Sequence, residues 1–221
     1  MATIPAAGCA SVAGPAGMIV PVAPDAVTLA VDALRGGEVV ALPTDTVYGL
    51  AALPTIPAAT DRLFALKGRG SDTPIAVLCA DAAQALGLAA PDALADEVRH
   101  IAEHLWPGPL TLVLPRRPGL GYELGEPADT VGVRCPDHAV VRAVAAVVGP
   151  IATTSANHHR EPTSPTAKGV AATFGAGLAL VLDGGRCEAP PSTVVAVTGA
   201  EWKVLREGPI PVTEVRAAAR R

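Results

Sequence analysis

The sequence predicts an α/β fold, and three observations support this prediction. Short apolar segments of strand length alternate along the chain with segments in which apolar residues recur at the helical period. Half of the residues are hydrophobic, chiefly Ala, Val and Leu, whereas aromatic residues make up only 3%. The 22 glycines and 22 prolines indicate many short elements joined by tight turns.

The bulk properties exclude several classes of protein. A chain of 221 residues can form one sizeable domain or two small ones. No apolar run reaches the roughly 18 residues of a membrane span, so no membrane partner is expected. The net charge of −4 gives no overall attraction to nucleic acid, although a local basic groove is still compatible with it.

The cysteines and the first residues indicate where the protein works. The four cysteines are widely spaced and form no C-x-x-C motif: Cys9, Cys79, Cys135 and Cys187. They predict neither a disulfide framework nor a zinc site, so we expect a reducing, cytoplasmic location. Residues 1–17 lack the basic start and long apolar run of a signal peptide. We expect them to form a disordered extension, with Met18 as an alternative start.

The first helix is expected over residues 24–35, where apolar residues follow the helical period. Asp25 is a candidate N-cap, and the two glycines at 36 and 37 end the helix. Residues 38–42 then form a short, mostly apolar strand, and Pro43 lies at its end because proline cannot donate a ladder hydrogen bond.

The segment after this strand concentrates polar groups. Thr44, Asp45, Thr46 and Tyr48 lie within a few positions of one another and are followed by Gly49. Open α/β sheets place ligands at the ends of strands, so this segment is a candidate binding site. An ordinary polar turn would use the same residue types.

A cationic segment follows the next helix, which is expected over residues 60–66 with Thr60 as its N-cap. Lys67 and Arg69 alternate with glycines, where the backbone can come close to a ligand. Such a pair suits a phosphate or a carboxylate. The alternative is a helix end at which cations complement the helix dipole.

A strand at 74–79 precedes helices at 81–88 and 91–105. The second helix contains His100, Glu103 and His104, which spell the H-x-x-E-H pattern of one class of zinc peptidases. A Trp-Pro-Gly-Pro run ends this helix at once, and no distant third ligand stands out. We therefore favour a solvated polar face over a metal site.

The rest of the chain continues the alternation. We expect strands at 110–114, 129–135, 151–154, 178–182, 194–197 and 202–205, a loop at 116–128, and helices at 138–148, 165–173 and 212–221. Arg134 lies among apolar neighbours in its strand, where a buried guanidinium needs an anionic partner; an exposed edge strand is the alternative. His158 and His159 lack metal spacing and are expected to face solvent.

Polar groups thus recur at the ends of separate strands: Thr44, Arg134, Ser155, Asn157, Ser192 and Arg206. They predict a shared polar cleft that binds an anionic ligand with many hydrogen-bond acceptors. The chain has no Walker A motif and no G-x-G-x-x-G after a strand. A nucleotide would therefore bind by another arrangement.

Eight motifs stand in the order that a known family has, and the resemblance that they carry covers roughly residues 18–209. They are PTDTVYGL (43–50), KGR (67–69), WPGPLTLVL (106–114), VGVRCPDH (131–138), TSAN (154–157), SPT (164–166), STVV (192–195) and LREG (205–208). In these motifs the chain resembles the YrdC-like threonylcarbamoyl-AMP synthases.

The resemblance implies a single α/β domain over 18–210, with a short tail at 211–221. The implied fold is a twisted mixed sheet with helices around a deep, positively lined cavity. The implied activity is that of a nucleotidyltransferase that makes threonylcarbamoyl-AMP and pyrophosphate from L-threonine, bicarbonate and ATP. Separate partner proteins would use the product to modify certain tRNAs. Because the sequence stops near Arg221, we expect no second domain of the kind that longer relatives carry.

The resemblance also implies the roles of individual residues. It assigns L-threonine to Thr44, Arg134 and Ser192, and it assigns ATP to Lys67, Arg69, Ser71, Thr130, Ser155, Asn157, Thr166 and Arg206. Arg134 can hold the carboxylate of the amino acid, and the hydroxyl of Thr44 can select the hydroxyl of threonine. Lys67 and Arg69, the implied catalytic residues, can neutralise the triphosphate.

Magnesium is the implied cofactor, held mainly by phosphates and water, with Asp45 as the nearest candidate to assist. The chain departs from the family pattern at Gly70, Thr73 and Ala196, and a longer segment before Ser164 leaves the alignment of Thr166 open. Three other functions stay open: an RNA-binding protein that uses the same cavity, a carbamoyl-adenylate enzyme with another acceptor, and a zinc peptidase.

Overall fold

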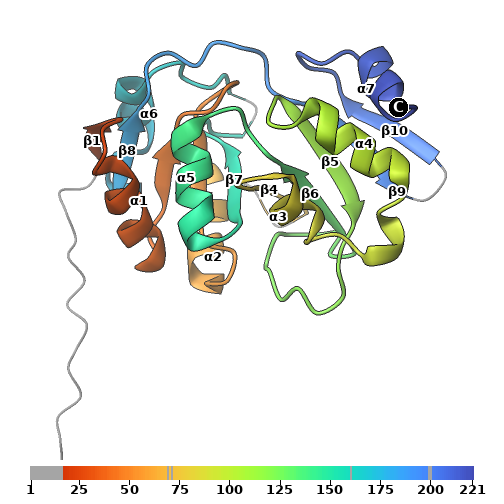
Figure 1. The fold of residues 1–221 in the computed structure, drawn as a ribbon. Coiled ribbons are helices and arrows are strands. Elements are labelled where there is room, and N and C mark those ends of the chain that lie inside the picture. The colour runs from red at the N-terminus through yellow and green to blue at the C-terminus, as the bar shows by residue number, and fades with distance from the viewer. Residues whose placement is uncertain (1–16, 69, 71, 160, 199–200) are drawn as a thin grey trace, which may run out of the picture.

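The computed structural model describes residues 17–221 apart from residues 69, 71, 160 and 199–200. Within this part of the chain one ten-stranded sheet runs in the order β1-β8-β2-β3-β7-β4-β6-β5-β9-β10 (Figure 1). Its strands are β1 (Met18–Pro21), β2 (Val40–Leu42), β3 (Gly49–Ala52), β4 (Ala76–Leu78), β5 (Leu110–Pro115), β6 (Thr130–Arg134), β7 (Ile151–Ser155), β8 (Leu180–Asp183), β9 (Thr193–Thr198) and β10 (Glu201–Arg206).

The sheet is mixed, because β6 pairs parallel with β4 and antiparallel with β5. The helices are α1 (Ala26–Arg35), α2 (Pro57–Lys67), α3 (Ala82–Leu86), α4 (Asp96–Leu105), α5 (Ala139–Val148), α6 (Ala167–Phe174) and α7 (Val212–Ala218), with short 3-10 turns η1 (Pro91–Ala93) and η2 (Gly175–Gly177). The predicted α/β domain is confirmed.

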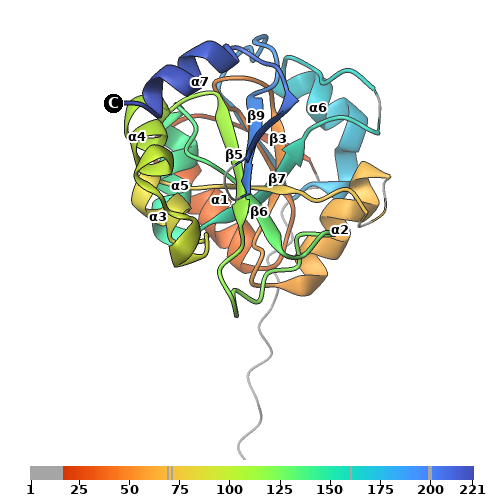
Figure 2. The ribbon, with the colours of Figure 1, turned by 90° about the vertical axis from the view of Figure 1, so that its right-hand side faces the viewer.

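Two apolar clusters hold the helices to the sheet. α1 and α5 lie side by side over one sheet face, where Val40, Leu42 and Ile151 are fully buried. The larger cluster includes Leu112 and Val133 of the opposite face together with apolar residues of α2, α4, α6 and α7. In Figure 2 the central strands stand between α3, α4 and α7 on one side and α2 and α6 on the other.

The sequence did not predict β1 or β3. β3 reads Gly-Leu-Ala-Ala, and glycine and alanine are poor strand formers. It is nevertheless paired on both sides, with β2 and with β7, so its neighbours override its local preference. β1 pairs with β8, and the backbone N–H of Gly17 donates to Leu178 O at 2.7 Å. Gly17 therefore belongs to the described fold and not to the expected extension; the rest of that prediction, residues 1–16, lies outside the described part.

Several helix ends differ from the prediction. α2 begins with Pro57 in its first turn, so Thr60 is not the N-cap, and its hydroxyl donates to Pro57 O at 2.8 Å. The helix expected over 91–105 is divided into η1 and α4. Asp25 occupies the N-cap position of α1 but makes no side-chain cap hydrogen bond.

Candidate active site

A cavity of about 360 Å³ lies on one face of the sheet. Elsewhere on the same face, α1 and α5 cover the strands. Strand alternation explains the floor of the cavity. Thr130, Gly132 and Arg134 of β6 line the cavity, whereas Val131 and Val133 point to the opposite cluster. The same alternation applies to the neighbouring strands, which contribute Ala76 and Leu78 of β4, Thr111 and Val113 of β5, Thr153 and Ser155 of β7, and Val194 of β9.

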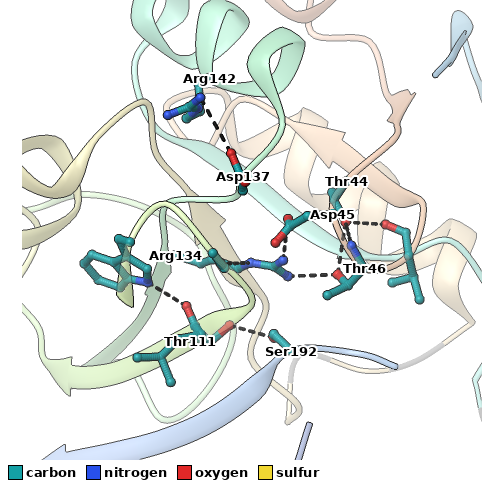
Figure 3. A network of polar contacts seen from close by, with 12 residues as sticks. Thr44, Asp45, Thr46, Thr111, Arg134, Asp137, Arg142 and Ser192 are labelled. Atoms are coloured by element: carbon teal, nitrogen blue, oxygen red, sulfur yellow. Dashed lines mark hydrogen bonds and ion pairs between the residues drawn. The ribbon is translucent and has the colours of Figure 1, made fainter. Parts of the chain in front are cut away.

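Arg134 is the buried cation of this cavity, with only 5% of its surface exposed. Its Nε donates to Gly108 O at 3.1 Å, and its two terminal nitrogens donate to Thr46 Oγ1 at 3.0 Å and Asp45 Oδ1 at 2.6 Å (Figure 3). Burial lowers the pKa of Arg134, and the Asp45 carboxylate opposes this shift. The predicted anionic partner of Arg134 is therefore Asp45, and the edge-strand alternative is wrong.

Two of the five N–H groups of Arg134 are left for a ligand. Three are used by Gly108, Thr46 and Asp45, and each terminal nitrogen retains one. Arg134 also lines the cavity. A fixed pair of donors on a planar guanidinium matches the two oxygens of a carboxylate.

The hydroxyl of Thr44 has no hydrogen-bonding capacity left in this arrangement. It donates to Val47 O at 2.7 Å and accepts from Thr46 N at 3.1 Å. Because its proton is used, the 3.0 Å contact with Thr46 Oγ1 has Thr46 as the donor. Thr44 therefore fixes Thr46, which in turn accepts from Arg134, and a direct contact from the Thr44 hydroxyl to a substrate would require these bonds to rearrange.

Ser192, which the resemblance assigns to L-threonine, is bonded to Arg206, which it assigns to ATP. Its hydroxyl lies 2.9 Å from Thr111 Oγ1 and accepts from a terminal nitrogen of Arg206 at 3.1 Å. Arg206 Nε also donates to Ser192 O at 2.9 Å. Ser192, Thr111 and Arg206 all line the cavity, so the predicted threonine and ATP residues share one wall.

The two arginines of the cavity act on each other electrostatically. Burial lowers the pKa of Arg206, and the positive charge of Arg134 lowers it further. Among the described residues that line the cavity there is no aspartate or glutamate. An anion bound between the two arginines would relieve their repulsion, so the electrostatics favour an anionic ligand.

Lys67 lies behind the cavity wall. It is only 3% exposed, and its ammonium donates to Ser155 O at 2.7 Å, to Ser155 Oγ at 3.1 Å and to Asn157 Oδ1. Ser155 lines the cavity, whereas Lys67 and Asn157 do not. Lys67 therefore fixes the turn that places Ser155 on the cavity lining.

The remaining predicted residues are placed as follows. Thr166 is the N-cap of α6, where its hydroxyl accepts from Gly169 N at 3.2 Å, and it does not line the cavity. Arg69 and Ser71 lie outside the described residues. The structure therefore brings together most of the predicted site: Thr44, Thr130, Arg134, Ser155, Ser192 and Arg206.

Comparison with known proteins identifies the family. Residues 32–208 match the model of the Sua5–YciO–YrdC family, which carries the description "Telomere recombination". A putative threonylcarbamoyl-AMP synthase of Mycobacterium leprae is 37% identical over 187 residues, which cover 84% of each chain. The chain belongs to the Sua5–YciO–YrdC family. The recognition made from the eight motifs is therefore confirmed.

A solved structure of this family gives the same fold. The structure of P. abyssi Sua5 complexed with L-threonine matches with a TM-score of 0.84 and 33% identity, covering 91% of this chain and 60% of that one. The threonylcarbamoyl-AMP synthase of Pyrococcus abyssi is 36% identical over 193 residues, which are 56% of its length. This chain thus spans little more than half of its longer relatives.

The sequence left one metal site open, the zinc-peptidase pattern at residues 100–104. The described residues contain no group of three or more His, Cys, Asp or Glu side chains that could hold a metal ion. His104 Nδ1 bonds to His100 O within α4, so the H-x-x-E-H pattern is part of a helix surface, although His100 is half-buried. His158 and His159 are exposed, as expected.

The described cysteines lack metal-ligand character. Cys79, Cys135 and Cys187 are free and buried. Burial raises the pKa of Cys135 to about 11, which keeps its thiol protonated at neutral pH. No helix within the described ranges is long and apolar enough to cross a membrane.

Sequence reasoning missed Thr111 as a member of the site, and it named Thr46 only as one polar residue of the candidate segment, without a role. Both residues stood within recognised motifs, but no local feature distinguished their hydroxyls from those of other threonines. Their roles depend on pairing between segments that are distant in sequence, since Thr111 contacts Ser192 and Thr46 contacts Arg134.

Proposed function

We propose that this chain is an L-threonylcarbamoyladenylate synthase, a nucleotidyltransferase that uses L-threonine, bicarbonate and ATP. The observation that carries the proposal is the cavity in which Arg134 and Arg206 are held among hydroxyl groups without a lining carboxylate. Family membership and the names of the relatives support the same activity. A related protein of the same fold has been described in complex with L-threonine.

The amino-acid end of the proposed site is centred on Arg134. Its two remaining N–H groups bind the carboxylate of L-threonine, and Asp45, Thr46 and Gly108 hold the guanidinium in place. Ser192 stands at the same wall and adds a hydroxyl. Bidentate binding by a pre-positioned guanidinium fixes the orientation of the amino group, which must react next.

The nucleotide end is centred on Arg206, which is exposed at the mouth of the cavity next to Leu205. Thr130 supplies a hydroxyl to the ligand, whereas the Ser155 hydroxyl already donates to Asn157 Oδ1 at 2.6 Å and can only accept from the ligand. Lys67 supports Ser155 from behind, and Arg69 completes the cationic motif in the proposal. Cations at this end stabilise the charge that builds on the triphosphate during phosphoryl chemistry.

The reaction has two steps. The amino group of L-threonine attacks bicarbonate, and loss of water gives a carbamate. A carbamate oxygen then attacks the α-phosphorus of ATP, the bond to the bridging oxygen breaks, and pyrophosphate leaves with that electron pair. No titratable base lines the described cavity, so we infer catalysis by positioning and charge stabilisation without a protein nucleophile.

Magnesium fits this site only as an ion carried by ATP. No carboxylate lines the described cavity, Asp45 Oδ1 is bound by Arg134, and Asp45 Oδ2 is buried without a partner. Magnesium supplies charge neutralisation of the triphosphate and is held by phosphate oxygens and water. We further propose a cytoplasmic enzyme whose product passes to separate tRNA-modifying proteins.

The test is pyrophosphate release from ATP and bicarbonate with and without L-threonine. We expect release that depends on threonine and stops when bicarbonate is removed. Release that ignores threonine would instead favour a carbamoyl-adenylate enzyme with another acceptor. Salt-sensitive RNA binding without any ATP consumption would favour an RNA-binding protein.

A variant pair tests the amino-acid end. Arg134→Lys keeps the charge but loses the planar pair of donors, so the KM for L-threonine is expected to rise about tenfold or more while the KM for ATP changes little. An equal rise in both constants would contradict the assignment of Arg134 to the amino acid. Lys203→Arg, on the β10 edge strand, is the matched control.

A further inference from the structure

Thr111 has no assigned role, yet it occupies a central position in the cavity. It is a residue of β5 with 6% exposure, and its side chain is on the cavity face. β5 and β6 are paired so that Leu112 faces Val133, and the next position along each strand brings Thr111 beside Arg134. On its other side Thr111 is in register with Val194 of β9, two positions beyond Ser192.

A count of protons shows what the Thr111–Ser192 pair can offer. The two hydroxyls carry two protons, and one of them lies in the 2.9 Å bond between the two oxygens. Neither hydroxyl donates to any other group among the described residues. The pair therefore keeps one proton that has no acceptor within the described protein.

The hydrogen bond from Arg206 limits how the two hydroxyls can share their protons. It donates to Ser192 Oγ at 3.1 Å and so occupies one of the acceptor positions of that oxygen. If Thr111 donates to Ser192, both acceptor positions are filled and Ser192 donates to the ligand. If Ser192 donates to Thr111, then Thr111 itself donates to the ligand. Either arrangement presents one hydroxyl donor beside Arg206, which bonds to Ser192, and beside Arg134, which Figure 3 shows together with Thr111 and Ser192.

We propose that Thr111 is a positioning residue for the amino-acid substrate, acting with Ser192 as a single hydroxyl donor to its carboxylate. This proposal rests on the proposed function, because it assigns the ligand oxygen to L-threonine. A carboxylate is an acceptor only, so it matches a wall that offers the N–H groups of Arg134 and one hydroxyl donor. The cross-strand position beside Arg134 places this donor next to the guanidinium that binds the same group.

The experiment compares Thr111→Val, which keeps the shape but removes the hydroxyl, with Thr111→Ser, which keeps the hydroxyl. Pyrophosphate release is measured over ranges of L-threonine and of ATP. Thr111→Val is expected to raise the KM for L-threonine about tenfold, with the KM for ATP within about twofold of wild type. Thr111→Ser is expected to restore the KM for L-threonine to within about threefold.

Thr60→Val is the control for removal of a buried hydroxyl, since Thr60 is fully buried on α2 and its hydroxyl donates to Pro57 O. An unchanged KM for L-threonine in Thr111→Val would overturn the proposal. So would equal rises for both substrates, or a loss that Thr111→Ser does not repair. Titration calorimetry with L-threonine alone, where Thr111→Val should weaken binding by the same factor, gives a readout that needs no turnover.

Ser192→Ala and the double variant Ser192→Ala/Thr111→Val close a double-mutant cycle. Each single variant leaves one hydroxyl whose proton can still turn toward the ligand, and only the double variant removes the donor. The double variant is therefore expected to raise the KM for L-threonine more than either single variant, by a factor that differs from the product of the two. Multiplicative effects would show two independent contacts and overturn the shared-donor proposal. If the wild-type protein ignores L-threonine in both assays, the proposed function fails, and this outcome is distinct from a failure of Thr111 alone.

Discussion

Arg134 is a buried charged residue, and the groups that accept its hydrogen bonds fix the orientation of its guanidinium. Asp45, Thr46 and Gly108 each accept one hydrogen bond from the guanidinium. Removing one member of the Arg134–Asp45 ion pair is costly, because the charge of the other member is then left buried without compensation. The carboxylate of Asp45 is therefore as important to the cavity as the arginine that faces it.

Replacing Asp45 tests this dependence. Asp45→Ala is expected to lower the free energy of unfolding by about 3 kcal/mol, because it strands the guanidinium of Arg134. Asp45→Asn is expected to cost less, since its amide oxygen can still accept from Arg134. Urea unfolding followed by circular dichroism measures both. Equal stability of Asp45→Ala and wild type would mean that Arg134 does not depend on this carboxylate.

Lys67 is the second residue whose partners define its role. The sequence suggested a cation exposed to phosphate, whereas the ammonium is buried against Ser155 and Asn157. Lys67→Ala is expected to abolish pyrophosphate release and to lower the free energy of unfolding by about 1–3 kcal/mol, because buried acceptors lose their donor. The exposed Lys168→Ala, on α6, is the control. Near-normal turnover in Lys67→Ala would refute its role.

At the scale of elements, β3 shows how the sheet determines local structure. Gly49 begins this strand opposite Ser155 of β7. A Cβ atom at Gly49 would lie 2.7 Å from Thr153 Cγ2, closer than two carbon atoms can approach. The glycine therefore permits the close approach of two strands that together form part of the cavity floor.

Gly49→Ala is expected to destabilise the protein by about 1–3 kcal/mol through this overlap. Thr153→Ser removes the opposing methyl group and keeps the hydroxyl, so the double variant is expected to recover most of the loss. Thermal unfolding of the two single variants and the double variant measures the coupling. Additive losses would show that the contact with Thr153 is not the cause.

The elements that the sequence predicted are those with a strong local signal. Apolar periodicity identified α1 and α5, and apolar runs identified β5 and β6 within one or two residues. β3 was missed because Gly-Leu-Ala-Ala has no strand preference of its own. The residues of the site were recognised by type, but the bonds of Thr111 to Ser192 and of Asp45 to Arg134 join segments far apart in sequence, which periodicity cannot relate.

At the scale of the whole molecule, acid stability should depend on His138. Burial lowers the pKa of this half-buried histidine, the carboxylates of Asp45 and Asp137 act in the opposite direction, and Arg142 lowers it further. The folded protein thus resists protonation of His138, whereas the unfolded chain takes up a proton below about pH 6.5. Stability is therefore expected to fall as the pH decreases through this region.

His138→Gln removes the titrating group, so its stability is expected to vary less than that of wild type between about pH 7 and pH 5. Urea unfolding at several pH values gives the two curves. The exposed His159→Gln is the control, and its curve should follow that of wild type. Parallel curves for His138→Gln and wild type would contradict the burial effect.

The position of β9 in the sheet has a consequence for protein synthesis. This strand inserts parallel to β5 and is followed directly by β10, and together these late segments bring Ser192 and Arg206 to a wall that begins with Thr44. A nascent chain lacks that wall until β9 and β10 have left the ribosome. A fragment that ends before Ser192 would keep Arg134 on β6 without the two later residues that stand near it in the folded domain.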